Sequence, residues 1–200
     1  PNEVTIELYN LDSDPHQDNN IYDQHPDVVA RMREYYEKWW EETQPYLEIP
    51  RPITIGHDAE NPSFLSAVTW ADAYVTQLSN ILDGRKVNGS WNLVVERDGD
   101  YEFELRRWPV EADTAIASAT DIKLTDPYVY GPVLKGTALP ITDARIKICD
   151  HDERAEVKAD DKGVKFSLKL KRGETQLKTW FYDKDGKELC GAYFVYVTRK

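Results

Sequence analysis

The stretch VKFSLKLK, residues 164–171, decides the fold class of most of the chain. Phe166, Leu168 and Leu170 occupy every second position, with lysines and a serine between them. A strand with this period of two has one buried face and one solvated face. Antiparallel sandwiches are built from such strands. The stretch therefore predicts a strand of an antiparallel β-sandwich.

Many other short strand-like runs surround this stretch, and helical periodicity is weak beyond residue 52. This pattern is typical of a β-sandwich. Two Asp-Gly pairs, Asp98–Gly99 and Asp185–Gly186, each predict a tight hairpin between the runs on either side. The predicted strand-like runs are residues 51–56, 64–70, 89–109, 114–124, 144–152, 155–160, 164–173 and 175–199.

Residues 1–45 have a different pattern. VTIELYNL, residues 4–11, predicts a half-buried strand, and an acidic loop follows it. Pro26 suits the first position of a helix that Pro45 is expected to end. One apolar stripe repeats along this helix every three or four residues: Val29, Met32, Tyr36 and Trp39. So small a unit cannot bury a core of its own, so its apolar stripe is predicted to pack on the second domain or on a missing body upstream, and packing on both is favoured.

The fold expected is therefore mainly β, or α+β overall. A strand and an amphipathic helix occupy residues 1–45, and an antiparallel sandwich occupies residues 46–200. The chain begins at Pro1 without an initiator Met, and it opens on what looks like the closing piece of a larger protein, which suggests a fragment.

The charge and composition argue against two classes of partner. Thirty-six carboxylates against 25 lysines and arginines give a formal charge of -11. Phosphate binding needs a basic face, so nucleic acid is not expected as a partner. For the same reason the chain is not expected to provide the main binding site for any polyanion, including a sulfated glycan. No apolar run approaches the ~20 residues of a membrane span, so no membrane is expected either.

The opening stretch ELYNLDSDPHQDNNIYDQHPDVVARMREYYEKWW, residues 7–40, resembles the C-terminal segment of the arylsulfatase family. The matching positions are Glu7, Leu8, Tyr9, Asn10, Leu11, Asp14, Pro15, Asn19, His25, Pro26, Val29 and Trp39. Residues 88–113 resemble an extra β-domain that a subset of bacterial sulfatases carries, which is similar in outline to galactose-binding-like sandwiches.

The resemblance implies a parent protein that hydrolyses sulfate esters, on a sulfated carbohydrate, with formylglycine and calcium. The family makes formylglycine from Cys or Ser in a C/S-x-P-x-R signature. Neither Cys149 nor Cys190 stands in that signature, so this chain is expected to hold no catalytic residue or cofactor and to be inactive alone. Its expected partner is the catalytic domain of the same polypeptide. The family also implies a periplasmic or secreted location.

An alternative function is a carbohydrate-binding module. Arg106, Trp108 and Trp70 are the candidate glycan contacts, because saccharide sites combine a ring for stacking with a guanidinium that clamps hydroxyls or sulfate. The competing interpretation places both tryptophans in the core. A further alternative is a dimerisation or interaction domain, which predicts self-association through the apolar stripe.

His57, Asp58 and Glu60 form a candidate metal loop, since oxygen ligands suit calcium. A plain turn is the competing interpretation. The acidic residues at 149–153 are interpreted as a solvated loop, with a calcium site as the less favoured alternative. The two cysteines lie in strand-like runs and are expected to be buried thiols, with a disulfide between them as the alternative.

Overall fold

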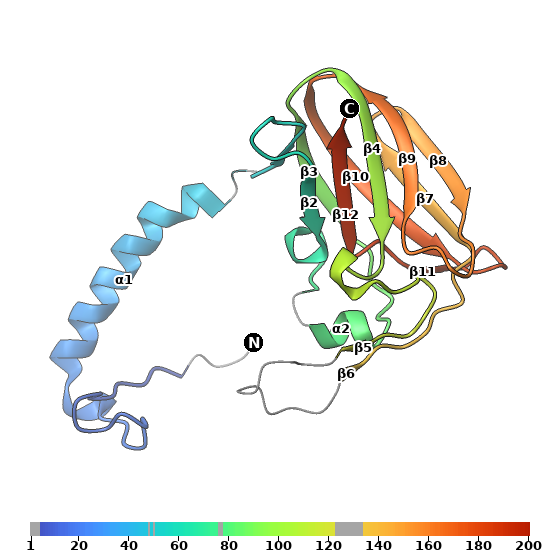
Figure 1. The fold of residues 1–200 in the computed structure, drawn as a ribbon. Helices are drawn as coiled ribbons and strands as arrows, with labels where there is room; N and C mark the ends of the chain where they lie inside the picture. Colours follow the sequence, from blue (N-terminus) through green and yellow to red (C-terminus); the bar gives the residue numbers. More distant parts are fainter. Residues whose placement is uncertain (1–4, 48, 50, 76–77, 123–133) are drawn as a thin grey trace. The chain divides into compact units, whose positions relative to one another are not determined.

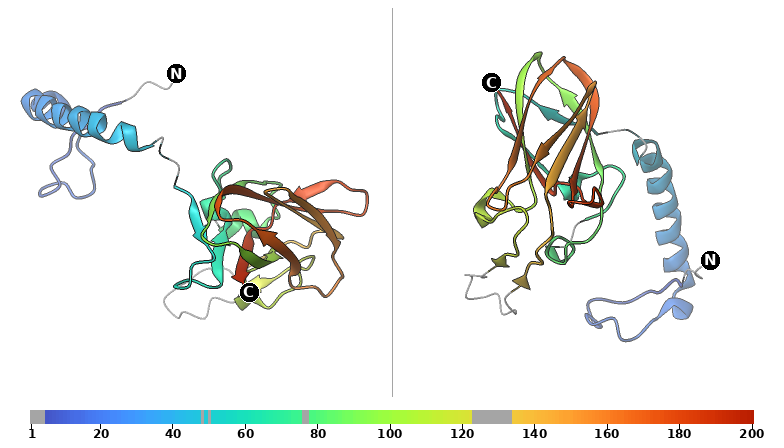
Figure 2. Two further views of the ribbon diagram at one scale, coloured as in Figure 1. Left: turned by 90° about the horizontal axis from the view of Figure 1, so that it is seen from above. Right: turned by 90° about the vertical axis from the view of Figure 1, so that its right-hand side faces the viewer.

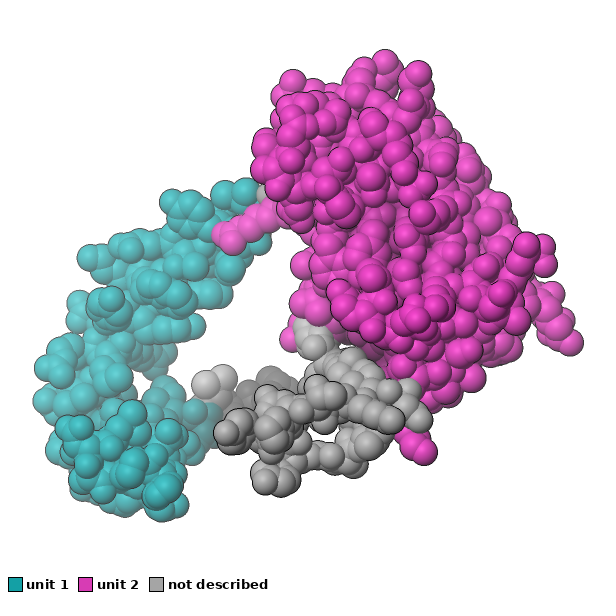
Figure 3. All heavy atoms as spheres, in the orientation of Figure 1, with its two compact units in different colours: residues 1–50 teal, residues 51–200 magenta. Residues whose placement is uncertain are grey.

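The computed structural model describes residues 5–47, 49, 51–75, 78–122 and 134–200. The chain is mainly β, as its alternating runs predict, and divides into two compact units, Pro1–Pro50 and Arg51–Lys200 (Figure 1, Figure 3). Within the described residues, no helix has the length and apolar character needed to span a membrane.

Unit 1 contains the helix α1, Pro26–Leu47, preceded by a 3-10 turn η1, Tyr22–Gln24. The helix begins where predicted but continues two residues beyond Pro45, so the predicted end was wrong. Pro45 lies in the last turn, where the lost hydrogen bond and the ring clash affect only one carbonyl. The helix therefore ends within two residues of it.

The predicted strand at residues 4–11 is wrong for its described part, residues 5–11, which form no strand; Val4 lies outside the described residues. The described part of unit 1 has no second strand to pair with this segment. Its backbone bonds locally instead: the Leu8 amide donates to Asn20 Oδ1 (3.0 Å), and the Ile21 amide donates to the Leu8 carbonyl (2.9 Å). The segment is thereby fixed beside the start of α1.

Unit 2 is a β-sandwich of two sheets, which form two layers (Figure 2). Sheet A has the order β1-β3-β10-β7-β8, with β11 also on β10: Ile53–Ile55, Ser90–Val95, Gly173–Tyr182, Asp143–Ile148, His151–Glu156 and Glu188–Cys190. Sheet B has the order β2-β12-β4-β9: Ser63–Ser66, Phe194–Arg199, Gly99–Arg106 and Val164–Leu170. Of the pairings described, only β1 with β3 is parallel.

Short elements complete unit 2 at one end of the sandwich (Figure 1). They are η2 Ala67–Thr69, α2 Leu78–Leu82, η3 Val110–Ala112 and the small pair β5 Asp121–Ile122 with β6 Leu134–Lys135. The predicted strand at residues 114–124 was therefore mostly wrong, because only Asp121–Ile122 is a strand; residues 123 and 124 lie outside the described residues.

The core lies between the two sheets. On β9 every second residue is buried, beginning with Val164, which confirms the predicted alternation. Trp91, Leu93 and Val95 of β3 are fully buried in the same cluster. Large apolar side chains from both sheets thus meet in one interior, as a sandwich requires.

The hairpin predicted at Asp98–Gly99 was wrong. β3 pairs with β1 and β10, whereas β4 pairs with β12 and β9, so the turn links the two sheets. The Asp98 carboxylate accepts the Arg172 amide (2.7 Å) and the Lys171 ammonium (2.9 Å), which ties this link to the neighbouring β9–β10 link. The Asp-Gly pair therefore predicted a turn of the chain correctly, but it did not predict which strands pair with β3 and β4.

The hairpin predicted at Asp185–Gly186 is confirmed, because β10 and β11 pair across it. After β11 the chain leaves sheet A, and β12 lies in sheet B between β2 and β4. The region of the predicted runs at 144–152 and 155–160 forms a further hairpin, β7–β8, but its turn is Cys149–Asp150, so the predicted break after residue 152 was wrong, and residues 157–160 are not strand. The predicted loop at 149–153 is thus only two residues long.

Candidate functional site

The predicted glycan contacts Trp70 and Trp108 are buried, with exposed fractions of 6% and 1%. Trp70 packs against Trp91 (ring centroids 5.6 Å apart) and Tyr193 (6.0 Å). Neither ring presents a face on which a sugar could stack. The prediction that these two residues contact a glycan was therefore wrong. Both are core residues, as the competing interpretation of the sequence proposed.

Arg106 is 8% exposed, and its guanidinium forms an ion pair with Glu104 at 2.7 Å, so it is not available to contact a glycan either. Its neighbour Arg107 is fully buried. The guanidinium of Arg107 lies 4.3 Å from the centre of the Trp108 ring and donates to the carbonyl of Thr137 (2.5 Å). Burial lowers the pKa of Arg107 from its usual value. Both arginines therefore serve the interior of the sandwich.

The candidate metal loop does not bring its ligand types together. His57 Nδ1 accepts the Ala59 amide (3.0 Å), and Asp58 forms ion pairs with Arg97 (2.8 Å) and Arg199. Arg97 and Arg199 hold the pKa of Asp58 below its usual range. Across the described residues, no three His, Cys, Asp or Glu side chains gather in a group that could hold a metal ion.

In unit 1 the predicted apolar stripe is present and open to solvent. Met32, Tyr36 and Trp39 are 55%, 54% and 48% exposed, and Val29 is half-buried. Tyr36 lies 5.8 Å from Trp39 and 6.4 Å from Trp40 between ring centroids. None of residues 5–47 is buried. The helix thus presents a continuous aromatic and aliphatic surface.

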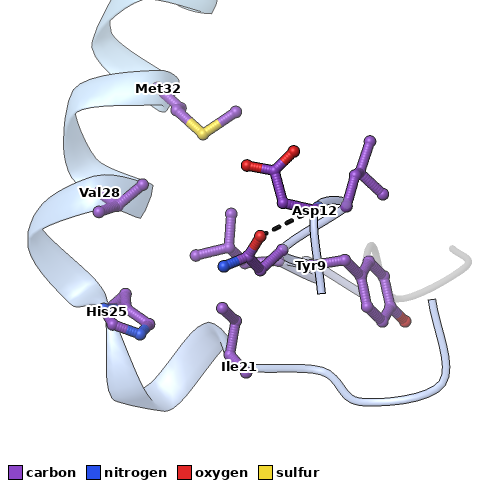
Figure 4. A pocket seen from close by; sticks show the side chains of 9 residues that line it. Tyr9, Asp12, Ile21, His25, Val28 and Met32 are labelled. Atoms are coloured by element: carbon purple, nitrogen blue, oxygen red, sulfur yellow. Dashed lines mark hydrogen bonds between the residues drawn. The ribbon is translucent and has the colours of Figure 1, made fainter. Parts of the chain in front are cut away.

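Two hollows border this stripe. The first, of about 410 Å³, lies between α1 and the preceding segment, where Met32, Val28 and His25 face Ile21 and Asp12 (Figure 4). The second, of about 510 Å³, continues along the helix. Its lining residues are Ile6, Glu7, Leu8, Val29, Met32, Arg33, Tyr36 and Glu37. Met32 borders both hollows, so the two form one mainly apolar surface, here called the unit 1 face.

A second candidate surface lies on the solvent side of sheet A. Along β10, Leu177, Thr179 and Phe181 are buried, so the alternate residues, including Trp180, point outward. Trp180 is directly opposite Arg145 of β7, whose guanidinium lies 4.7 Å from the ring centre. The ring is half-buried rather than part of the core.

Side chains around Trp180 form a shallow hollow of about 370 Å³, here called the Trp180 hollow. Its lining residues are Lys147, Cys149, Thr175, Gln176, Lys178 and Trp180. Arg145 borders it and is held by Asp152 through two hydrogen bonds of 2.6 and 2.5 Å. This pair fixes the guanidinium against the ring.

Our sequence interpretation missed this surface, although a signal was present. In TQLKTWF, residues 175–181, apolar or small residues alternate with Gln176, Lys178 and Trp180. A tryptophan in phase with polar residues on an alternating strand is expected on the solvent face. The same rule puts Trp91 in phase with Leu93 and Val95, in the core.

The two cysteines differ, and both are free. Cys190 is buried, as predicted. The prediction that Cys149 is buried was wrong: it is exposed in the β7–β8 turn, with a positive φ of 50°, and its thiol donates to Thr175 Oγ1 (3.2 Å). A two-residue turn leaves its side chains outside the sheet.

This difference predicts unequal thiol reactivity. Burial raises the pKa of Cys190 to about 12, so near neutral pH it holds almost no thiolate, the form that reacts. A disulfide reagent at about pH 8 should therefore modify one thiol per chain, at Cys149, and a second only in denaturant. Cys149→Ser should abolish the fast reaction. Equal, fast modification of both thiols in the native protein would contradict the assignment.

No family model matches the chain, and no curated protein matches it. Among solved structures, a ruminal GH26 endo-beta-1,4-mannanase aligns with 70% of this chain at 14% identity and a TM-score of 0.36. The chain spans 26% of the length of that protein. A similarity of this size assigns neither a family nor an activity.

Proposed function

We propose that the chain is the C-terminal accessory region of an arylsulfatase-type sulfuric ester hydrolase and has no catalytic group of its own. The sequence resemblance over residues 7–40 and 88–113 motivates this proposal. The observation that supports it most is the unit 1 face, which needs a partner. A second body of the same polypeptide is the partner that the resemblance implies.

The physical argument rests on exposure. Met32, Tyr36 and Trp39 each leave about half of their surface open, although they lie on one side of one helix. Fully burying a side chain of this size contributes roughly 1.5–3 kcal/mol. Because about half of each side chain is already covered, packing on the catalytic body would add roughly half of that value for each of the three residues, about 1 kcal/mol.

In the proposed protein the catalytic body supplies formylglycine, calcium and the sulfate-binding groups. Unit 1 covers one side of that body, and the sandwich follows unit 1 in the sequence. The proposed substrate is a sulfated carbohydrate, and the proposed location is the periplasm or the cell exterior. The acidic charge of -11 suits a region that does not itself form the sulfate-binding centre.

The decisive experiment is to sequence the gene upstream of the codon for Pro1 and to express the whole reading frame. The expected result is a C/S-x-P-x-R signature upstream and hydrolysis of 4-nitrophenyl sulfate or a sulfated sugar by the intact product. A reading frame without that signature, or an intact product without sulfatase activity, would overturn the proposal.

The 200-residue chain alone is expected to self-associate as its concentration rises, because the unit 1 face lacks the proposed catalytic body. Sedimentation velocity over a range of concentrations measures this. Met32→Glu/Trp39→Glu should abolish association. The matched control Arg31→Gln/Lys38→Gln changes the net charge by the same amount on the opposite side of α1 and should leave association unchanged. A clean monomer at high concentration would count against an adhesive unit 1 face.

A further inference from the structure

We infer that the Trp180 hollow binds an anionic saccharide, a sugar chain that bears sulfate or carboxylate groups. The inference rests on the sandwich alone and does not require that the chain belong to a sulfatase. It is argued from three properties of the hollow: its local charge, its aromatic ring and its hydrogen-bonding groups.

The local charge is opposite in sign to that of the chain. Of the six residues that line the hollow, two are lysines, Lys147 and Lys178, and none is a carboxylate. The full sequence, by contrast, has 36 acidic residues against 25 basic ones. In the described part of the chain, neither lysine forms an ion pair. Two lysines that point to one hollow favour an anionic ligand.

A carboxylate beside the hollow, that of Asp152, has another partner. Asp152 is the cross-strand neighbour of Lys147, yet both of its oxygens accept from Arg145. Its charge is therefore largely neutralised by the guanidinium that lies against the Trp180 ring. Glu174 and Asp143 also lie on outward positions, at the two ends of β10 and β7, and neither lines the hollow. The centre of the face remains positive.

The ring and its neighbours match the chemistry of a sugar. Trp180 supplies an aromatic surface for the C–H face of a pyranose, and the amide of Gln176 and the hydroxyl of Thr175 suit sugar hydroxyls. Gln176 Nε2 also reaches Asn92 Oδ1 on β3 (3.3 Å), which extends the polar row across the sheet. The hollow is shallow and lies along strands, so it suits an extended chain better than a compact ligand. An aromatic ring with adjacent ammonium groups favours an anionic saccharide over a neutral one.

The test is titration calorimetry with the whole 200-residue chain and four probes: a sulfated oligosaccharide, an oligogalacturonate, a neutral manno-oligosaccharide and inorganic sulfate. We expect binding of at least one anionic oligosaccharide, weakened when the salt concentration is raised from about 0.05 M to 0.5 M. Preference between the first two probes identifies sulfate or carboxylate as the recognised group. Equal binding of the neutral probe, or binding of inorganic sulfate as tight as that of the oligosaccharide, would overturn the inference.

Variants locate the site. Trp180→Ala and, separately, Lys147→Gln/Lys178→Gln should each weaken binding by about tenfold or more, equivalent to one lost good contact. The control Lys158→Gln/Lys169→Gln removes the same charge from exposed lysines outside the hollow and should bind as the unaltered chain does. Circular dichroism checks that each variant is folded. If the control weakens binding as much as the hollow variants do, the attraction is a property of overall charge and the assignment of the site is wrong.

Discussion

Replacing Trp91 by alanine is expected to lower the free energy of unfolding of the sandwich by about 3–5 kcal/mol. Trp91 is fully buried between the sheets, and its indole Nε1 donates to the Ser66 carbonyl (2.9 Å). It also meets Trp70 edge to face. Truncation removes a large apolar volume, leaves a cavity and removes the donor from a carbonyl. A domain of ordinary stability would lose a large fraction of its free energy of unfolding.

Urea unfolding followed by circular dichroism measures this loss without depending on the fluorescence of the altered residue. The matched control is Trp180→Ala, the same substitution on the solvent face of sheet A, which should cost about 1 kcal/mol or less because its contact with Arg145 is open to water. Similar losses for the two variants would mean that the division into buried and outward tryptophans is wrong.

The second large effect is expected at Arg107. Arg107→Ala should cost about 1.5–3 kcal/mol from its charged hydrogen bonds, and more from the cavity that it leaves. Arg107 stacks on Trp108 and donates to the carbonyl of Thr137, and the Trp108 indole donates to the carbonyl of Ser118 (3.1 Å). These contacts connect the end of β4 to two separate loop segments.

Arg107→Met separates packing from charge, because methionine fills much of the same space without a donor. We expect it to lie between the alanine variant and the unaltered chain in urea unfolding. Burial opposes the charged form of Arg107, as its lowered pKa indicates, so the charge contributes less than its hydrogen bonds alone suggest. A methionine variant at least as stable as the unaltered chain would show that the hydrogen bonds do not offset the cost of burying the charge.

Local periodicity was enough to predict the fold class, but it could not predict which strands pair with each other. The alternation around Phe166 and Leu168 is a property of one strand, and the structure reproduces it. The partner of a strand depends on residues far along the chain, as in the parallel pairing of Ile55 with Val95. Asp98–Gly99 shows the difference: the turn is real, yet its strands belong to opposite sheets because each finds its partners elsewhere.

The candidate sites were predictable to different degrees. The apolar stripe through Met32 and Tyr36 follows directly from helical spacing, although nothing in the spacing says what covers it. The error at Trp108 had a physical cause. The sequence shows an arginine beside a tryptophan, which suits a sugar site and a buried cation–π pair equally well, and only the loops that cover the end of β4 decide between them. Trp180 was predictable from its phase, because it alternates with buried residues and shares the outward side of its strand with Gln176 and Lys178.

The position of β12 has a consequence for synthesis. Phe194–Arg199 lies between β2 and β4, so without it β2 has no neighbour in sheet B and β4 keeps only β9. During translation, β2, β4 and β9 leave the ribosome first and remain unable to close the sheet until this late segment emerges. The strand edges of sheet B are therefore exposed in the interval between the emergence of β2 and that of β12, and a chaperone that shields such edges would act on the nascent sandwich in that interval.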